Sequence, residues 1–207
     1  MDLINNIHIK NISKLLEDIG ERIEGNLICD IEPYNYVINR NIDKIKNLQY
    51  LVKNKKKILE IGVNACHSLL IMLLINPHAE YLLFDLGEHL YTRKCIKYIN
   101  QNFPNTKINI IYGDSTFTIT EYIKNNSSIL NTFDLIHLDG GHTENIFNID
   151  YKNSKKLISK NGVVIFDDYD FINIKNFIDN KIKKNEIIEY KNNNLIKNKF
   201  HFIYKYN

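Results

Sequence analysis

The residues best suited to chemistry in this chain end one apolar stretch, FDLIHLDGGH at positions 133–142. Asp139 and His142 stand three positions apart, with two glycines between them. A second apolar stretch, NGVVIFDD at 161–168, ends on Asp167 and Asp168. Carboxylates suit a hard cation such as Mg²⁺ or Mn²⁺, and an imidazole, which titrates near neutral pH, can accept a proton. If the fold brings these four side chains together, they predict proton transfer beside a bound cation.

Five apolar stretches rich in β-branched residues predict the strands that position these side chains, and helical patterns separate them. The predicted strands are 56–62, 80–86, 107–113, 132–139 and 161–168. The predicted helices are 68–75, 89–103, one that opens at Ser115, a long one after His142, and 171–184. Strands that alternate with helices pair in parallel, with helices on both faces of the sheet, so we expect a doubly wound α/β fold. The last two stretches, 186–190 and 199–206, read as a hairpin that closes one edge of the sheet.

Every predicted strand ends in an acid, at the edge of the sheet where open α/β folds bind their ligands. These acids are Glu60, Asp85, Asp114, Asp139 and the pair Asp167–Asp168. Taken singly, each is more readily explained as a helix N-cap or as a partner of a helix dipole. Together they concentrate negative charge in one crevice, which a fold tolerates best where cations bind.

The loop EIGVNACHS at 60–68 matches neither the glycine-rich dinucleotide fingerprint nor a Walker motif, so NAD and ATP are weakly supported. Gly62 permits a close approach of the backbone to a ligand, and Asn64 tolerates a left-handed conformation. Glu60 offers a carboxylate to an ammonium group rather than to a phosphate. Asp85, at the end of the next strand, suits a ribose diol.

Over roughly residues 56–205 the chain resembles the class I S-adenosylmethionine-dependent methyltransferases, through the motifs EIGVNACHS, FDLGEH, YGDS and FDLIHLDGGH. The resemblance implies a seven-stranded, mostly parallel Rossmann-like sheet with an antiparallel C-terminal edge strand. It implies the following cofactor-binding residues: Glu60, Gly62, Asn64, Ala65 and Ser68 at the methionine part, Asp85 at the ribose, Gly113, Asp114 and Ser115 at the adenine, and Asp139. Many relatives carry a second glycine where this chain has Cys66, so we expect Cys66 to face away from the cofactor.

Asp139 and the pair Asp167–Asp168 resemble the metal site of the metal-dependent O-methyltransferases, both the catechol type and the antibiotic-sugar type such as the macrocin and mycinamicin enzymes. VIFDDYD at 164–170 is most similar to the sugar group. The resemblance implies that the three aspartates hold Mg²⁺ or Mn²⁺, which orients a vicinal diol. The catechol type has a lysine base three residues past the first aspartate, where this chain has His142. We therefore expect Asp139 and His142 to be catalytic; the alternative for His142 is a solvent-facing residue at a helix start.

These features predict a metal-dependent O-methyltransferase that uses S-adenosylmethionine and acts on a small molecule, with a sugar or nucleotide sugar preferred over a catechol. One alternative is methylation of RNA or protein, which the weak net charge of +3 and the lack of an Asn/Asp-Pro-Pro-Tyr-type motif disfavour. Another is an adenosyl-ligand-binding protein without catalysis. Such a protein would have no use for Asp139, His142, Asp167 and Asp168.

Length and composition fit one domain: 207 residues, 44% hydrophobic and 25% charged. We expect a methyltransferase domain at 51–207 and a helical or loop preamble at 1–50 that acts as a lid or a dimer contact, so that a homo-oligomer is possible. No apolar run can span a bilayer and no secretory signal is recognised, so we expect a cytoplasmic protein without membrane or nucleic-acid partners. Cys29, Cys66 and Cys95 form no CxxC pair and are expected to be reduced thiols.

Overall fold

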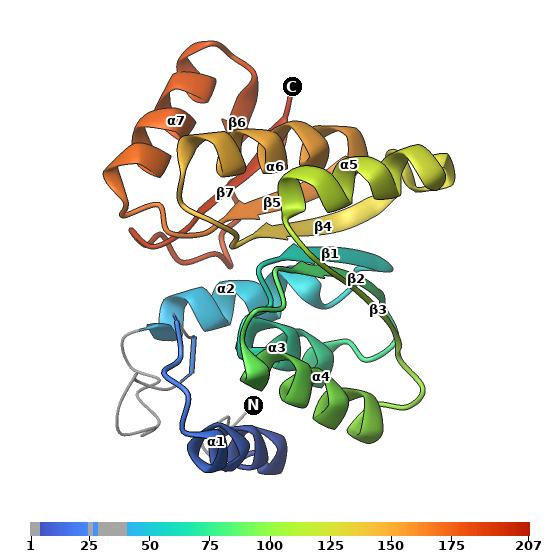
Figure 1. Ribbon diagram of the computed structural model, residues 1–207. Coiled ribbons are helices and arrows are strands. Elements are labelled where there is room, and N and C mark those ends of the chain that lie inside the picture. The colour runs from blue at the N-terminus through green and yellow to red at the C-terminus, as the bar shows by residue number, and fades with distance from the viewer. Residues whose placement is uncertain (1–4, 25–26, 29–40) are drawn as a thin grey trace.

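The computed structural model describes residues 5–24, 27–28 and 41–207 and contains one seven-stranded sheet between two layers of helices (Figure 1). The strand order is β3-β2-β1-β4-β5-β7-β6. The strands are β1 (Lys57–Ile61), β2 (Glu80–Asp85), β3 (Lys107–Tyr112), β4 (Phe133–Leu138), β5 (Ile158–Phe166), β6 (Ile187–Glu189) and β7 (Phe202–Tyr206). The first five are parallel, and β7 runs antiparallel to both β5 and β6. The prediction of a doubly wound, mostly parallel seven-stranded sheet is confirmed.

Helices α1 (Ile7–Ile19), α2 (Ile42–Val52), α3 (His67–Ile75) and α4 (Leu90–Asn102) cover one face of the sheet. The other face carries α5 (Ser115–Asn125), α6 (Glu144–Leu157) and α7 (Ile172–Lys183), with a short 3₁₀ helix, η2 (Ser127–Ile129), after α5. None of the described helices is both long and apolar enough to cross a bilayer.

The core lies in two layers because successive side chains of a buried strand point to opposite faces. In β1, Ile58 packs with the layer of α1 to α4, and its neighbour Leu59 packs with the layer of α5 to α7. The strands therefore read as continuous apolar runs, and the polar residues that follow them all gather at one edge of the sheet.

Helix α3 is apolar on almost every side, since the residues from 67 to 73 are all buried. A helix of this kind needs cover on its outer face as well as on the sheet. Helix α2 supplies part of that cover by packing against α3, with Leu48 and Val52 buried in the same core. The described part of the N-terminal preamble thus shares one core with the rest of the chain, and its role as a lid or dimer contact stays a prediction.

The C-terminal strand β7 is antiparallel, as the resemblance implied, and it lies between β5 and β6 rather than at the margin of the sheet. The hairpin partner β6 forms that margin, because the chain passes through the three-residue strand β6 first and then returns beside β5. The predicted hairpin is therefore present, with β3 at the opposite edge of the sheet.

Candidate active site

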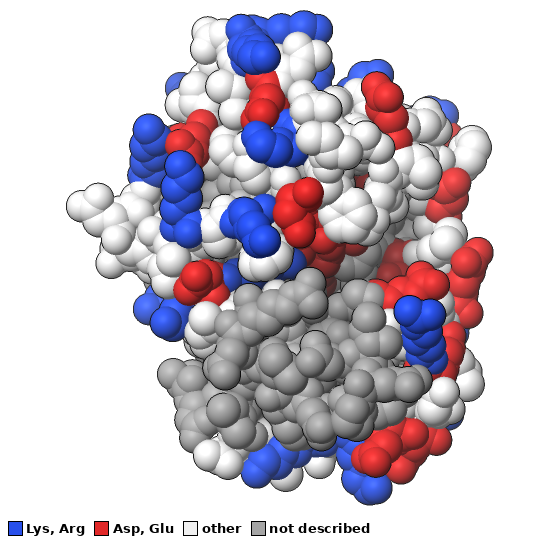
Figure 2. Space-filling view, turned by 90° about the vertical axis from the view of Figure 1, so that its left-hand side faces the viewer, with Lys and Arg blue, Asp and Glu red and all other residues white. Residues whose placement is uncertain are grey.

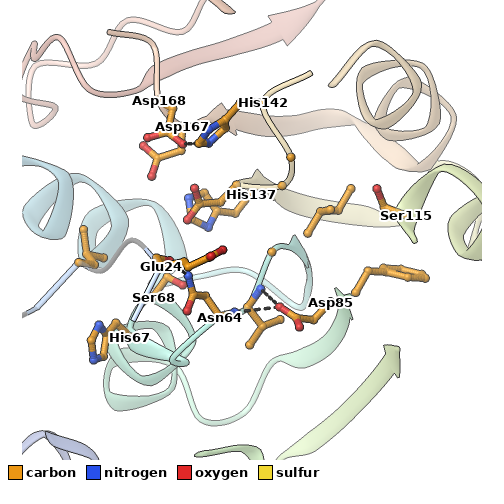
Figure 3. Close-up of a pocket in the computed structure, with 18 of the residues that line it drawn as sticks. Glu24, Asn64, His67, Ser68, Asp85, Ser115, His137, His142, Asp167 and Asp168 are labelled. Atoms are coloured by element: carbon orange, nitrogen blue, oxygen red, sulfur yellow. Dashed lines mark hydrogen bonds and ion pairs between the residues drawn. The ribbon is translucent and has the colours of Figure 1, made fainter. Parts of the chain in front are cut away.

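A cavity of about 750 Å³ opens at the carboxyl ends of the parallel strands, where the acids predicted from the sequence meet (Figure 3). Its volume is within the usual range for sites that take a cofactor and a small substrate. The lining includes Gly62 and Asp85 on one side, and Asp139, His142 and Asp167 on the other. One cavity can therefore hold a cofactor beside an acceptor.

The loop after β1 is held in place by Asp85, at the end of β2 (Figure 3). One carboxylate oxygen of Asp85 accepts hydrogen bonds from the backbone N–H groups of Val63 and Asn64, at 2.9 Å each. The other oxygen accepts from the N–H of Gly87 at 2.8 Å. Each carboxylate oxygen can accept about two hydrogen bonds, so the oxygen on Gly87 can accept one more, and Asp85 can shape the loop and still accept from one hydroxyl of a diol.

Gly62 is the point where the loop passes closest to the neighbouring strand. It has a φ of +83°, and a Cβ built on it would lie 1.9 Å from the backbone oxygen of Asp139. Only glycine fits such a contact, because both the positive φ and the missing side chain are needed. The close approach brings the cofactor loop against the start of the Asp139–His142 segment.

Cys66 stands where relatives often have a second glycine, and its φ of 62° explains that preference. Its side chain is fully buried in the core beside Cys95 and does not line the cavity. Burial is the main cause that raises the pKa of the Cys66 thiol well above its usual value. Cys66 therefore faces away from the cavity, as predicted, and both described cysteines are free thiols; Cys29 lies outside the described residues.

Directly after β3, Gly113, Asp114 and Ser115 line the cavity. Asp114 also caps α5, since its Oδ1 accepts from the N–H of Thr116 at 2.8 Å. Asp114 is therefore both a helix N-cap and a residue of the cavity wall. The hydroxyl of Ser115 hydrogen-bonds to the buried carboxylate of Asp150 on α6. Burial raises the pKa of Asp150 to about 7.

Glu60 and His137 form a buried pair across β1 and β4, in which His137 lines the cavity and Glu60 lies behind it. They face each other in the strand register, and His137 Nδ1 donates to Glu60 Oε1 at 2.9 Å. Burial opposes protonation of His137, but the bond to Glu60 and the charge of Asp139 raise its pKa to about 9. Glu60 is fully buried and does not line the cavity, and its Oε2 has no hydrogen-bond partner among the described residues. Its contact with the cofactor ammonium stays a prediction.

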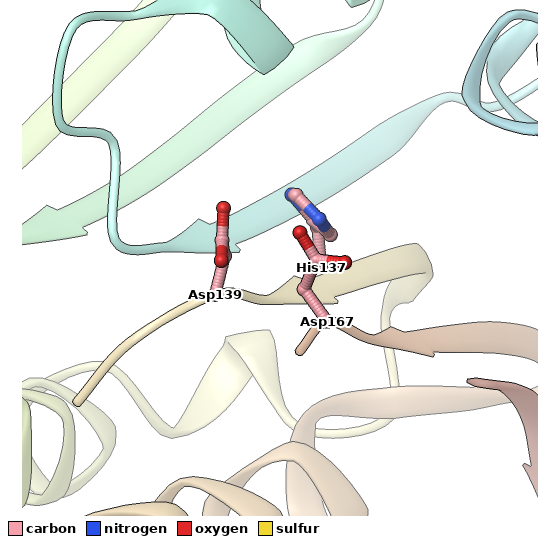
Figure 4. A group of neighbouring side chains, drawn as sticks. All are labelled: His137, Asp139 and Asp167. Carbon is pink, nitrogen blue, oxygen red and sulfur yellow. The ribbon is translucent and has the colours of Figure 1, made fainter. Parts of the chain in front are cut away.

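The side chains of His137, Asp139 and Asp167 converge at the ends of β4 and β5 (Figure 4). One nitrogen or oxygen atom from each lies within 4.8 Å of the others. Burial, and then the charge of Asp167, raise the pKa of Asp139 well above its usual value. Burial would raise the pKa of Asp167 too, but the charges of Lys44, His137 and His201, together with the hydrogen bond from Lys44, outweigh burial and lower that pKa. The surrounding cationic groups therefore stabilise the ionised form of Asp167.

Lys44 on α2 was not predicted as a site residue. Its Nζ lies 2.5 Å from Asp167 Oδ2, and both side chains are largely buried, with 13% and 4% of their surfaces exposed. Burial lowers the pKa of Lys44, but the charges of Asp167, Asp139 and Asp168, together with the hydrogen bond to Asp167, outweigh burial, so that the pKa is raised and the lysine is a cation. A helical lysine usually points to solvent, so the sequence carried no signal for this contact.

His142 and Asp168 stand at the mouth of the cavity. His142 Nε2 donates to Asp168 Oδ2 at 2.6 Å, and this bond raises the pKa of His142 (Figure 3). The ring of Phe171 lies 4.6 Å from the His142 ring, between centroids, and Phe171 is 48% exposed. His142 is thus oriented by a carboxylate on one side and by an aromatic ring on the other.

The donor set at Asp139 and Asp167 fits a hard divalent cation. Asp167 Oδ1 is buried without a hydrogen-bond partner among the described residues, and a second carboxylate and an imidazole lie beside it. A buried unpaired carboxylate oxygen is costly unless something coordinates it. The predicted third ligand, Asp168, has its carboxylate on His142 instead, and His137 is the third group that lies nearest. The assignment of ligands stays a prediction.

Most of the predicted residues line the one cavity. They are Gly62, Asn64, Ala65, Ser68, Asp85, Gly113, Asp114, Ser115, Asp139, His142, Asp167 and Asp168. Glu60 lies behind its wall, and the sequence missed Lys44, His137, Asp150 and Phe171 as neighbours of these residues.

Residues 59–169, more than half of the chain, match the family model described as "Methyltransferase domain". No curated protein matches the sequence. Solved structures are similar at low identity. An O-methyltransferase from Bacillus cereus in complex with SAH has a TM-score of 0.67 at 16% identity, over 99% of this chain and 92% of that chain.

CalS11, a TDP-rhamnose 3'-O-methyltransferase of calicheamicin biosynthesis, has a TM-score of 0.64 at 11% identity, over 96% of this chain and 94% of that chain. TomG, an O-methyltransferase from Streptomyces achromogenes in complex with SAM, has a TM-score of 0.65 at 12% identity, over 98% and 91%. These similarities establish a shared fold. Together with the family match and the cofactor loop braced by Asp85, they lead to one conclusion: the chain belongs to the methyltransferase domain family, with the class I S-adenosylmethionine-dependent fold.

Proposed function

We propose that this protein transfers a methyl group from S-adenosylmethionine to a hydroxyl of a small molecule, with the help of a divalent cation. The favoured acceptor is a sugar or nucleotide sugar with a vicinal diol. The observation that carries the proposal is the carboxylate pair Asp139 and Asp167, which lies in the same cavity as the cofactor loop and has His142 at its mouth.

The cofactor would lie along the loop from Gly62 to Ser68, with its ribose on Asp85 and its adenine near Ser115. Asp139 and Asp167 would hold Mg²⁺ or Mn²⁺, with Asp168 or His137 as a further ligand. When bound, the cation would bind and acidify the acceptor hydroxyl.

His142 would take the proton from that hydroxyl. Its ring stands at the cavity mouth, and Asp168 fixes the orientation of the ring through Nε2. A histidine base contributes most when its pKa lies near the working pH, and the hydrogen bond to Asp168 raises the pKa of His142.

A catechol is the second candidate acceptor, and Phe171 favours it. The half-exposed ring of Phe171 stands beside His142 and offers an apolar wall to a flat aromatic substrate. A sugar could contact Phe171 through the apolar face of its ring. The contact therefore does not distinguish the two acceptor classes, and a methyl-transfer assay on both is needed.

RNA is disfavoured as an acceptor by the charges around the cavity. Lys44 is the one lysine or arginine among the described lining residues, and it is paired with Asp167. On the face seen in Figure 2, basic side chains are interspersed with acidic ones and form no continuous basic surface. Phosphate backbones are bound by such surfaces.

The test begins with calorimetric titration of S-adenosylhomocysteine into the protein, in Mg²⁺ and in EDTA. A methyl-transfer screen over glycosides, nucleotide sugars and catechols follows. Asp167→Asn and His142→Ala should lose turnover while they retain adenosyl-ligand binding. Lys152→Met, which changes an exposed lysine on α6 that does not line the cavity, serves as a control.

Failure to bind S-adenosylhomocysteine would refute the cofactor assignment. Turnover that is equal in Mg²⁺ and EDTA would refute the metal, and wild-type turnover in His142→Ala would refute the base. Transfer to a catechol alone would replace the sugar by the second candidate.

A further inference from the structure

Lys44 places a positive charge beside the carboxylates of the proposed metal site. Its ammonium group is 2.5 Å from Asp167 Oδ2, and the charges of Asp139 and Asp168 also act on it. The contact is shielded from solvent, since only 13% of the Lys44 side chain is exposed. This is a formed ion pair inside the cavity rather than a surface lysine near an acid.

The helix that carries Lys44 is anchored so that the lysine is held at this position. Asn47, one turn further along α2, is fully buried. Its side chain accepts from the N–H of Ile196 and donates to the carbonyl of Ile196, at 2.7 Å each, and its amide also contacts His201 Nε2 at 2.9 Å. These bonds join α2 to the segment before β7, and β7 pairs with β5, the strand that Asp167 follows.

The carboxylate that binds Lys44 is also one of the groups that converge in Figure 4. A divalent cation at this group and an ammonium on the same carboxylate would be two positive charges a few ångströms apart in a site screened from water. Repulsion between charges at such a distance is strong where the surroundings are less polar than water. Lys44 on Oδ2 of Asp167 would therefore repel a divalent cation that binds the other carboxylate oxygen, Oδ1.

We propose that Lys44 is a built-in counter-ion that a divalent cation must displace from Asp167. The proposal rests on the metal site of the proposed function and adds to it that the site exchanges one cation for another. With Lys44 moved off the carboxylate, its ammonium would face the cavity that it already lines, and it could there contact the acceptor.

The first test measures cation affinity without cofactor or acceptor. Mg²⁺ and Mn²⁺ are titrated calorimetrically into the wild type, Lys44→Met and Lys46→Met. Lys46 lies on the same helix but is exposed, so its variant removes an equal charge without touching Asp167. Lys44→Met should bind the cations about tenfold or more tightly than the wild type, a change on the scale found for residues that contact metal ligands. Lys46→Met should bind like the wild type.

A second test follows the wild-type lysine itself, so that it does not depend on a folded variant. The protein is treated with an amine-acetylating reagent with and without saturating Mn²⁺, and the acetylation of each lysine is read by peptide mass spectrometry. Acetylation of Lys44 should rise several-fold when the cation is present, relative to that of Lys46, because the ammonium is released from Asp167.

Three results would overturn the proposal. The first is cation binding by Lys44→Met that is unchanged, weaker or absent. The second is a gain in cation affinity in Lys46→Met equal to that in Lys44→Met. The third is acetylation of Lys44 that stays constant or falls with Mn²⁺. The proposed function fails on other measurements, since adenosyl-ligand binding and methyl transfer are read independently of both tests.

Discussion

Replacing Asp150 by asparagine should make the protein more stable, and the gain should grow with pH. Asp150 is 2% exposed, and its Oδ1 has no hydrogen-bond partner among the described residues. Burial raises its pKa from an ordinary value of 3.8 to about 7, although the hydrogen bond from Ser115 works in the opposite direction. Near neutral pH and above, folding therefore has to keep a charge out of water, and an asparagine removes that cost.

The sign follows from the two pKa values. Because the folded-state pKa is raised, the stability contributed by protonated Asp150 is complete below the unfolded-state pKa and is lost as pH rises to the folded-state pKa of about 7. An interval of about three pH units corresponds to ~4 kcal/mol at most. Asparagine leaves its buried amide imperfectly paired, so we expect a net gain of about 1–3 kcal/mol at pH 8.5.

The assay is urea unfolding of the wild type and Asp150→Asn at pH 5.5 and pH 8.5, followed by circular dichroism. The difference in free energy of unfolding between the two proteins should widen by about 2 kcal/mol from the lower to the higher pH. Asp179→Asn is the matched control, because Lys175 lowers the pKa of this more exposed carboxylate and its removal should bring no gain at high pH. A difference that is the same at both pH values, or a less stable Asp150→Asn at pH 8.5, would refute the reasoning.

Three further substitutions test the loop and its supports. Gly62→Ala should abolish adenosyl-ligand binding in calorimetry or prevent folding, because its Cβ would collide with the backbone of Asp139; binding like that of the wild type would show that β1 and β4 separate easily. Asp85→Ala should raise the dissociation constant for S-adenosylhomocysteine by roughly 100-fold, since the loop loses two charge-assisted hydrogen bonds, and a change below threefold would contradict this role. Asn47→Ala should lower the free energy of unfolding by roughly 2–4 kcal/mol in urea, because Ile196 loses its two hydrogen bonds with Asn47; Asn194→Ala, on the exposed part of the same segment, should change it little.

The strands and their ends were predictable because burial on both faces leaves a continuous apolar run that stops where the chain leaves the sheet. The predicted 132–139 became β4 at Phe133–Leu138, so Asp139 follows the strand as expected. Acids at the ends of parallel strands must meet at one edge, so their convergence needed no knowledge of the strand order.

His137 shows where a single sequence stops being sufficient. It lies within an apolar stretch and is buried, but its pairing with Glu60 depends on which strands pair and in which register. Lys44 depends on still more, since the sequence separation from Asp167 is 123 residues and the contact exists only because α2 docks on the finished sheet. Charged residues on a helix carry no local signal for such a contact.

The anchor of α2 also sets the order in which the site can be completed. Asn47 is bound to a residue 149 positions later, so closing this contact fixes nearly three quarters of the chain into one loop. Contacts of such long range form late in folding, because the entropy lost in closing a long loop opposes them until the intervening chain is structured. During synthesis, the ribosome has released the sheet strands β1 to β5 before Ile196 emerges. The cofactor loop can therefore take shape on a growing chain, whereas Lys44 reaches Asp167 only after the C-terminal segment has arrived, and the two halves of the cavity mature in sequence.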